Sequence, residues 1–460
     1  MKKHLSSLFG LLAVLTLLLG ACAPAATPTP AAPQPTTAPA ASQPTTPPAA
    51  PQPTTPPAQP TAASAQQQTT VNIVHYFTGD LGKKYITQIM QSFMAANPQY
   101  KVVDNTTGHE DFKTQILVML AGNNPPDIFS YWAGARTQFV VDANRLLPLD
   151  DWWAVNNMDN AIPANLKPMA TYNGKIYNVP MNAHIVAMFY NPKVMQKVGV
   201  TTMPTTWNDF LALCDKLKAA GVTPIALGSK NQWPAQYWFD YLISRTAGPD
   251  YRQQLMGGKA SYTDPQVVKA MQMWKDLVDK GYFVKNANAY DWTDAADQVA
   301  KGEAAMTLMG TWITGYWDSN NLKAGTDYDF FPFPVIDPSI PVVVHGSIDG
   351  WAIPADTRNK AGAEALLAWF LKPENQAIWA KGQGALAANK NTDPSIYNSV
   401  MKKAADYLGQ VQFLSGYDLS TTPPMATGGL NMFAQFMNDP SKYQDYLTQT
   451  EATAKQVFNK

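Results

Sequence analysis

The chain of 460 residues has little of what several classes of protein require. It contains only two cysteines, so it cannot build a disulfide framework. Charged residues make up only 15%, and 34 basic residues balance 34 acidic ones, so the excess charge needed to bind nucleic acid or another polyanion is missing. Arginine occurs only five times. Aromatic residues are plentiful instead, with 13 Trp, 20 Tyr and 18 Phe, which favours recognition through ring faces.

Motifs of the common enzyme classes are also missing from residues 71–460. This part of the sequence has no H-E-x-x-H zinc motif, P-loop, G-x-S-x-G elbow or dinucleotide-binding fingerprint. His109 and Glu110 are adjacent but have no further partner at metal-ligand spacing. We therefore expect no catalytic residues, no cofactor and no metal.

The N-terminus has the pattern of an export signal. Lys2 and Lys3 precede an apolar run from Leu8 to Leu19, which is short for a membrane-spanning helix. The following Gly20-Ala21-Cys22 resembles the bacterial lipoprotein box, in which the signal is cut before an acylated cysteine. We expect residues 1–21 to be a signal peptide and Cys22 to hold the protein at the outer face of the cytoplasmic membrane. The alternative is an ordinary secretion signal with a chance cysteine.

Residues 22–70 are rich in Pro, Thr and Ala and contain no charged residue. Such a segment cannot build a hydrophobic core, and its prolines favour extended polyproline II. We expect a disordered stalk between the lipid anchor and a folded body.

The folded body from Val71 onward alternates short β-rich runs with amphipathic helices, which predicts an α/β fold. Its first part predicts the order β-α-β-α-β, with the elements at 71–74, 84–95, 100–104, 112–121 and 127–130. Farther on, Thr206 is expected to cap a helix that ends near Gly221 and turns Cys214 toward the core. Cys214 is therefore expected to be a buried, inert thiol.

The stretch from Asp294 to Trp317 is the most informative. It predicts a helix to Lys301, a break at Gly302, a buried strand over 304–309 and a second helix that starts near Trp312. In open α/β sheets, ligands bind where strands end and helices begin. Trp312 is therefore the strongest single candidate for a ligand contact.

The segment from Gly302 to Trp312 closely resembles the most characteristic segment of the family 1 extracellular solute-binding proteins of carbohydrate ABC transporters, which are maltose-binding-protein-like. Further segments resemble the same family in the expected order, at residues 126–129, 173–180, 188–191, 204–210 and 369–376. The resemblance covers essentially all of residues 71–460. It departs from the maltose-binding protein at Gly134 and Ala135, which lack an acidic side chain, and this argues against maltose as the ligand.

The resemblance implies the periplasmic-binding-protein type II fold, with two α/β lobes joined by a multi-crossing hinge and a ligand cleft between them. We expect lobe 1 at residues 71–183 plus 346–386 and lobe 2 at residues 184–345 plus 387–460. The chain should cross near residues 181–184, 345–347 and 385–389. The implied ligand is a sugar or oligosaccharide, the implied partners are ABC permease subunits, and we expect a monomer.

Sugars present apolar faces flanked by hydroxyls, so their sites combine aromatic rings with hydrogen-bonding side chains. In the first lobe, the resemblance places contacts after the first strand, at Tyr76 and Asp80, although Asp80 could equally cap the next helix. Trp132 lines up with a stacking position, and Arg136 could donate two parallel hydrogen bonds.

Other candidates lie in the hinge and the second lobe. Asn182 and His184 fall in a predicted crossing, where His184 could also be a hinge residue. Trp233 is preferred to Trp238, which begins an apolar helix. Four more candidates are Asp291, Trp292, Asp349 and Trp351. Asp349 and Trp351 lie in a segment, 345–351, that looks like a loop, although Trp351 could belong to a buried strand. Other tryptophans on amphipathic helices are assigned to packing, namely Trp207, Trp274, Trp369 and Trp379.

Three other functions remain open at the sequence level. A sugar-sensing or adhesive lipoprotein could use the same fold without transport. A glycoside-processing enzyme would need two carboxylates across a sugar, for which Asp80, Asp291 and Asp349 are available. Glycerol phosphates or polyamines would require more convergent charge than the candidate loops offer.

Overall fold

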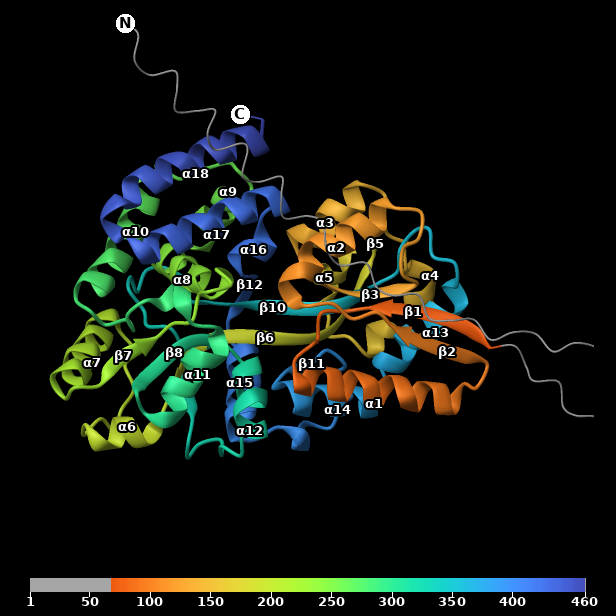
Figure 1. Ribbon diagram of the computed structural model, residues 1–460, viewed down its shortest axis with the longest axis horizontal. Coiled ribbons are helices and arrows are strands. Elements are labelled where there is room, and N and C mark those ends of the chain that lie inside the picture. Colours follow the sequence, from red (N-terminus) through yellow and green to blue (C-terminus); the bar gives the residue numbers. More distant parts are fainter. Residues whose placement is uncertain (1–67, 460) are drawn as a thin grey trace, which may run out of the picture. The chain divides into compact units, whose positions relative to one another are not determined.

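The computed structural model describes residues 68–459, shown in Figure 1. The predicted signal peptide, Cys22 and nearly all of the predicted stalk lie outside the described residues. The first elements follow the predicted β-α-β-α-β order: β1 (Thr69–Val74), α1 (Asp80–Ala96), β2 (Tyr100–Asp104), α2 (His109–Ala121) and β3 (Ile128–Trp132). Strand β1 begins two residues earlier than expected, because Thr69 and Thr70 pair with Tyr100 and Lys101 of β2.

A mixed sheet runs through the body in the order β2-β1-β3-β10-β6-β8-β7. Strands β1, β2 and β3 are parallel to one another, whereas β10 (Val343–Ala352) is antiparallel to β3 and to β6 (Asn178–Tyr190). Strand β8 (Ala304–Gly310) is antiparallel to β6 and parallel to β7 (Thr223–Ala226). The predicted α/β class is confirmed.

The side chains of the first lobe pack into one hydrophobic core. Besides the elements from β1 to β3, this lobe contains α3 (Ala135–Asp142), α4 (Asp150–Val155), α5 (Lys167–Ala170), β4 (Thr171–Tyr172), β5 (Lys175–Ile176), α13 (Lys360–Phe370) and α14 (Pro373–Gln383). Trp379, which was assigned to packing, is 1% exposed within this core.

The second lobe surrounds two adjoining clusters of buried side chains. In its first part lie α6 (Pro192–Lys197), α7 (Trp207–Ala219), β7, α8 (Gln236–Thr246), α9 (Pro249–Met256), α10 (Pro265–Asp279), α11 (Trp292–Lys301), β8, α12 (Trp312–Ser319) and β9 (Asp329–Phe331). Its last part contains α15 (Ser399–Leu408), β12 (Gln412–Ser415), α16 (Tyr417–Ser420), α17 (Pro423–Asn438) and α18 (Tyr443–Val457). Among residues 68–459, no helix is both long and apolar enough to cross a membrane.

Local predictions in the second lobe are confirmed. The Thr206 hydroxyl caps α7 by accepting a hydrogen bond from the Asp209 backbone N–H. Cys214 is fully buried, and burial raises the pKa of its thiol, so it is a packing residue rather than a nucleophile. Gly302 ends α11 in the left-handed conformation, at a φ of 77°, and α12 begins at Trp312.

Two long neighbouring strands, β6 and β10, connect the lobes (Figure 1). The first half of β6 pairs with β10, and its second half pairs with β8 and β9 in the second lobe. Strand β10 starts beside β12 and ends beside β3 in the first lobe. The short strand β11 (Leu386–Ala387) pairs with β6 at Ala183 and Asn182, which brings a third segment to the same place.

The expectation that residues 345–351 form a loop is wrong, because they lie inside β10. All ten residues of this strand are buried, so their backbone groups must find partners in the neighbouring strands. Gly346 and Gly350 permit close packing of the strands. A Cβ atom at Gly346 would lie 1.9 Å from the His184 carbonyl oxygen in β6.

Candidate functional site

The side chains of both lobes and of the crossing strands meet in one closed circuit, in which each member contacts the next. The first lobe contributes Tyr76 and His109, the crossing strands contribute His184 and Asp349, and the second lobe contributes Trp233 and Trp312. Five of these six were predicted from the sequence. We call these six residues the site circuit.

The polar part of the site circuit lies on the crossing strands. The Tyr76 hydroxyl, just after β1, donates to the Asp349 carboxylate at 2.5 Å. On the other side of the same carboxylate, the His184 Nε2 atom lies 3.7 Å away. Asn182 connects the two strands, because its side-chain oxygen accepts from the Asp349 backbone N–H and its amide nitrogen lies 3.2 Å from His184 Nε2. Asn182 is fully buried, and the other three residues are at most 7% exposed.

Burial shifts the ionisation of this polar group. It raises the pKa of Asp349 to about 6, although hydrogen bonds from Tyr76 and Asn182 oppose the shift. Burial also lowers the pKa of His184 to about 3, so the imidazole is neutral at physiological pH. The crossing strands therefore offer a carboxylate that accepts hydrogen bonds and a neutral imidazole beside it, a combination suited to hydroxyl groups.

Aromatic rings form the first-lobe side of the site. Trp132, the last residue of β3, stacks on Tyr76 with ring centroids 4.3 Å apart. His109 stands edge-on to both rings, at 5.4 Å from Tyr76 and 5.3 Å from Trp132. Sequence reasoning missed His109 as a site residue because it was tested only for metal-ligand spacing. The available signal was its place between the predicted strand at 100–104, which pairs with β1, and the predicted helix at 112–121, because ligands of open α/β sheets bind where strands end and helices begin.

Two tryptophans form the second-lobe side. Trp312 begins α12 directly after β8, and its ring stands 5.2 Å from His184. The preceding Thr311 hydroxyl lies 2.9 Å from His184 Nδ1, which ties the hinge histidine to this turn. Trp233 lies 5.7 Å from Trp312 and, across the lobes, 6.2 Å from His109.

Arg136 is buried beside the site but already has a partner. Its Nε atom donates to the Asp418 backbone carbonyl at 3.2 Å, and its Nη2 atom lies 3.5 Å from the Asp418 carboxylate. The guanidinium also lies 5.6 Å from the ring centre of Trp132. Asp418 belongs to α16, and its backbone N–H donates to Gln236 of α8. We predicted that two N–H groups of the Arg136 guanidinium would bind a ligand. They contact Asp418 instead and so connect α3 of the first lobe to α16.

Three of the predicted residues, Trp351, Asp291 and Trp292, have their printed contacts away from the site circuit. Trp351 is fully buried in the first core, where it stacks on Phe370 at 4.4 Å and donates from its indole N–H to the Met181 sulfur. Asp291 caps α11 and accepts a hydrogen bond from Asn231. Trp292 stands edge-on to Tyr316. Asp80 is the first residue of α1, and its side chain lies outside the described residues.

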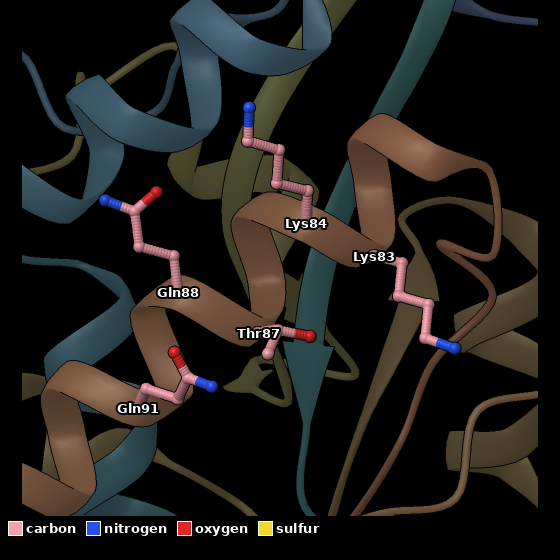
Figure 2. Close-up of a pocket in the computed structure, with 5 residues that line it drawn as sticks. All are labelled: Lys83, Lys84, Thr87, Gln88 and Gln91. Atoms are coloured by element: carbon pink, nitrogen blue, oxygen red, sulfur yellow. The ribbon is translucent and has the colours of Figure 1, made fainter.

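Two surface hollows of the body lie elsewhere. One follows the polar face of α1 and is lined by Lys83, Lys84, Thr87, Gln88 and Gln91, whose side chains project from a single helix (Figure 2). The other lies between α7 and α10, beside Trp207. Neither hollow is lined by a candidate ligand residue. Within residues 68–459, no group of three or more His, Cys, Asp or Glu side chains is placed to hold a metal ion.

Residues 79–377 match the family model of the bacterial extracellular solute-binding proteins. The chain belongs to this family. It is 29% identical to an uncharacterized ABC transporter extracellular-binding protein of Pyrococcus horikoshii, over 79% of this chain and 80% of the relative. It is also 29% identical to a probable sugar-binding periplasmic protein of Mesorhizobium japonicum, over 74% and 81% of the two chains.

Solved structures of solute-binding proteins share the fold. The bacterial solute receptor AcbH superposes with a TM-score of 0.78 at 28% identity, over 85% of this chain and 99% of that one. The predicted periplasmic-binding-protein type II fold is thereby confirmed. The expectation that this solute-binding protein is not an enzyme is also confirmed, because its relatives and structural neighbours are substrate-binding receptors.

Proposed function

We propose that this solute-binding protein captures a sugar between its two lobes and delivers it to the permease of an ABC importer. One observation carries the proposal: ring faces and hydrogen-bonding groups from both lobes and from the crossing strands converge in the site circuit. A ligand held there touches both lobes, which is the condition for a ligand to favour closure.

The composition of the site suits an uncharged polyhydroxyl ligand. Trp233 and Trp312 are only partly buried, so parts of their rings can contact the C–H surfaces of a sugar. Trp132 stacks on Tyr76 at the first-lobe side of the site. Asp349, His184 and Asn182 supply acceptors and donors for its hydroxyls. The guanidinium of Arg136 is paired with Asp418, so it adds no free positive charge that would favour a phosphate.

The relatives support the same ligand class. The protein of Mesorhizobium japonicum is named as probably sugar-binding, and AcbH is described as having an exclusive substrate preference for β-D-galactopyranose. We propose Tyr76, Trp132, Asn182, His184, Trp233, Trp312 and Asp349 as ligand contacts, and Arg136 as a link between the lobes. Asp80, Asp291 and Trp292 stay predictions, and we propose Trp351 as a packing residue.

The rest of the proposed transport function follows from the sequence. Residues 1–21 direct export, and acylated Cys22 holds a monomer at the outer face of the cytoplasmic membrane on the stalk of residues 22–70. Lobe 1 (71–183 plus 346–386) and lobe 2 (184–345 plus 387–460) close on the sugar and present the closed form to the permease.

A thermal-shift screen against mono- and oligosaccharides tests the proposed ligand class. A ligand that binds only the folded protein adds about 2.7 kcal/mol of stability at 100 times its Kd, which is readily detected. We expect a rise in Tm with at least one sugar, and mass analysis should recover that sugar unchanged. The absence of a shift with every sugar would contradict the proposal.

A further inference from the structure

The short helix α16 (Tyr417–Ser420) packs into both lobes, outside the crossing strands. Tyr417 is fully buried in the core of the second lobe, where its ring stands edge-on to Phe433 of α17 at 5.1 Å. Leu419 follows two residues later, is 4% exposed and belongs to the core of the first lobe. The helix therefore connects the two cores within three residues.

Hydrogen bonds fix α16 to the second lobe. The Tyr417 backbone N–H donates to the Asp240 carboxylate of α8 at 2.8 Å. The next backbone N–H, of Asp418, donates to the Gln236 side chain of the same helix, also at 2.8 Å. Asp240 is in turn paired with Arg252 of α9 at 2.7 Å, and both of these side chains are fully buried. We therefore expect α16 to move with the second lobe.

The first lobe contacts α16 through the start of α3. The Arg136 Nε atom donates to the Asp418 backbone carbonyl at 3.2 Å, and its Nη2 atom lies 3.5 Å from the Asp418 carboxylate. Gly134, just before α3, approaches so closely that a Cβ atom there would lie 2.3 Å from the Leu419 carbonyl oxygen. The two Arg136 contacts are longer than the 2.8 Å bonds that fix α16 to α8, so they should break first when the lobes separate.

Breaking these contacts is unfavourable, and the contacts involve protein groups alone. The side chains of Arg136 and Asp418 are only 5% and 9% exposed, and a largely buried charge that loses its partner is destabilising. Leu419 would also lose its burial in the core of the first lobe. Both effects oppose separation of the lobes.

We propose that Arg136, Asp418 and Leu419 form a clamp that holds the lobes together without a sugar, so that part of the free protein is already closed. This inference rests on the proposed closure of the lobes on a sugar and adds to it a contribution from the protein itself. The apparent affinity for a ligand depends on the fraction of protein in the binding-competent arrangement. The clamp therefore raises the affinity for sugar without contacting it, and Arg136 is a positioning residue.

Small-angle X-ray scattering of the free full chain tests the clamp in the wild type, Arg136→Gln, Asp418→Asn and the double variant. Residues 1–67 are the same in every variant, so a difference in the radius of gyration reports on the body. We expect a larger radius than that of the wild type in all three variants. The double variant leaves neither charge unpaired, so it remains a valid test where a single variant fails to fold.

The same proteins are then titrated calorimetrically with D-galactose, or with the mono- or oligosaccharide that gives the largest thermal shift. We expect each clamp variant to bind at least threefold more weakly than the wild type and to reach the wild-type radius at saturation. Lys193→Gln is the matched control, because it also replaces a cation by glutamine but its partner, Asp327, lies in the same lobe. The control should keep the wild-type radius and affinity.

Each other outcome has a distinct meaning. Equal radii for the free wild type and the clamp variants would overturn the clamp. A loss of affinity without a change in the free radius would also overturn it, because Arg136 would then act by direct contact with the sugar. An equal increase in radius in Lys193→Gln would show general loosening instead. A wild type that binds no sugar would overturn the proposed function, whereas the radii of the free proteins would still decide the clamp.

Discussion

Asp349, a proposed ligand contact of this solute-binding protein, is buried at a cost to stability. Its carboxylate is 5% exposed, and no Lys or Arg is paired with it in the body; its contacts are Tyr76, Asn182 and His184. Burial without a cationic partner is what raises its pKa to about 6. The ordinary value is 3.8, so the folded protein holds this proton over a range of pH in which the unfolded chain has released it.

The sign of the resulting pH dependence follows from linkage. Between about pH 4 and pH 6 the folded state binds more protons than the unfolded state, so Asp349 makes stability fall as the pH rises through this window. Asp349→Asn removes this pH-dependent contribution to stability and keeps an oxygen that can accept a hydrogen bond from the Tyr76 hydroxyl. We expect the variant to gain on the order of 1–3 kcal/mol relative to the wild type from pH 4 to pH 7 in urea unfolding.

Burial also raises the pKa of Asp240 to about 6. Asp240 is present in both the wild type and Asp349→Asn, so the difference between their curves of unfolding free energy against pH reports on Asp349. The same substitution should weaken sugar binding at pH 7 at least tenfold, since it replaces a charged acceptor. A difference in unfolding free energy between the wild type and Asp349→Asn that does not change with pH would contradict the raised pKa of Asp349.

At the scale of elements, the two crossing strands hold the site in register. Asp349 pairs with Asn182 and Ser347 pairs with His184, so the polar residues of β10 and β6 lie opposite one another. The close approach of the strands depends on Gly346, where a Cβ atom would meet the His184 carbonyl oxygen at 1.9 Å and the Phe413 ring at 2.8 Å. Any larger residue there must push β10 away from β6.

Gly346→Ala should therefore destabilise the protein by about 1–3 kcal/mol, the usual cost of overpacking. Gly409→Ala is the matched control, because the nearest atom to its Cβ would be the Asp406 carbonyl oxygen at an ordinary 3.5 Å. The control should change stability by no more than about 0.5 kcal/mol. Equal urea midpoints for the two variants would show that the spacing of the strands does not depend on Gly346.

Much of this arrangement could be predicted from local sequence patterns. The helix cap at Thr206, the break at Gly302 and the position of Trp312 after a buried strand each depend on a few neighbouring residues. Contacts between distant segments could not be predicted in this way. His109 joins the site only because α2 follows the strand beside β1, and Arg136 pairs with Asp418, which lies 282 residues away. Gly346 and Gly350 permit the close approach of β10 to β6, whereas glycines in a sequence are more typical of loops.

At the scale of the whole molecule, ligand-driven closure requires a ligand that interacts with both lobes. Tyr76 and Trp132 extend from the first lobe, and Trp233 and Trp312 extend from the second. Only a ligand with different affinities for the open and closed arrangements can shift the balance between them. The crossing strands β6 and β10 are continuous through both lobes, so they are the elements about which the lobes would rotate.

Small-angle X-ray scattering tests this closure. We expect the radius of gyration of the wild type to fall when the sugar identified in the thermal-shift screen reaches saturation, because the bound ring holds the lobes together. Sugars that give no thermal shift are the matched control and should leave the scattering unchanged. Identical scattering from the free and the saturated protein would contradict ligand-driven closure.

The most direct test of the central claim, that a sugar binds within the site circuit, is calorimetric titration of the wild type and Trp312→Ala. Trp312 is only partly buried, and its ring contacts His184 and Trp233, so its removal should leave the fold intact. We predict one sugar per wild-type chain and a loss of at least tenfold in affinity in Trp312→Ala, as expected of an aromatic anchor for the ligand. Wild-type affinity in a folded Trp312→Ala protein would contradict the claim.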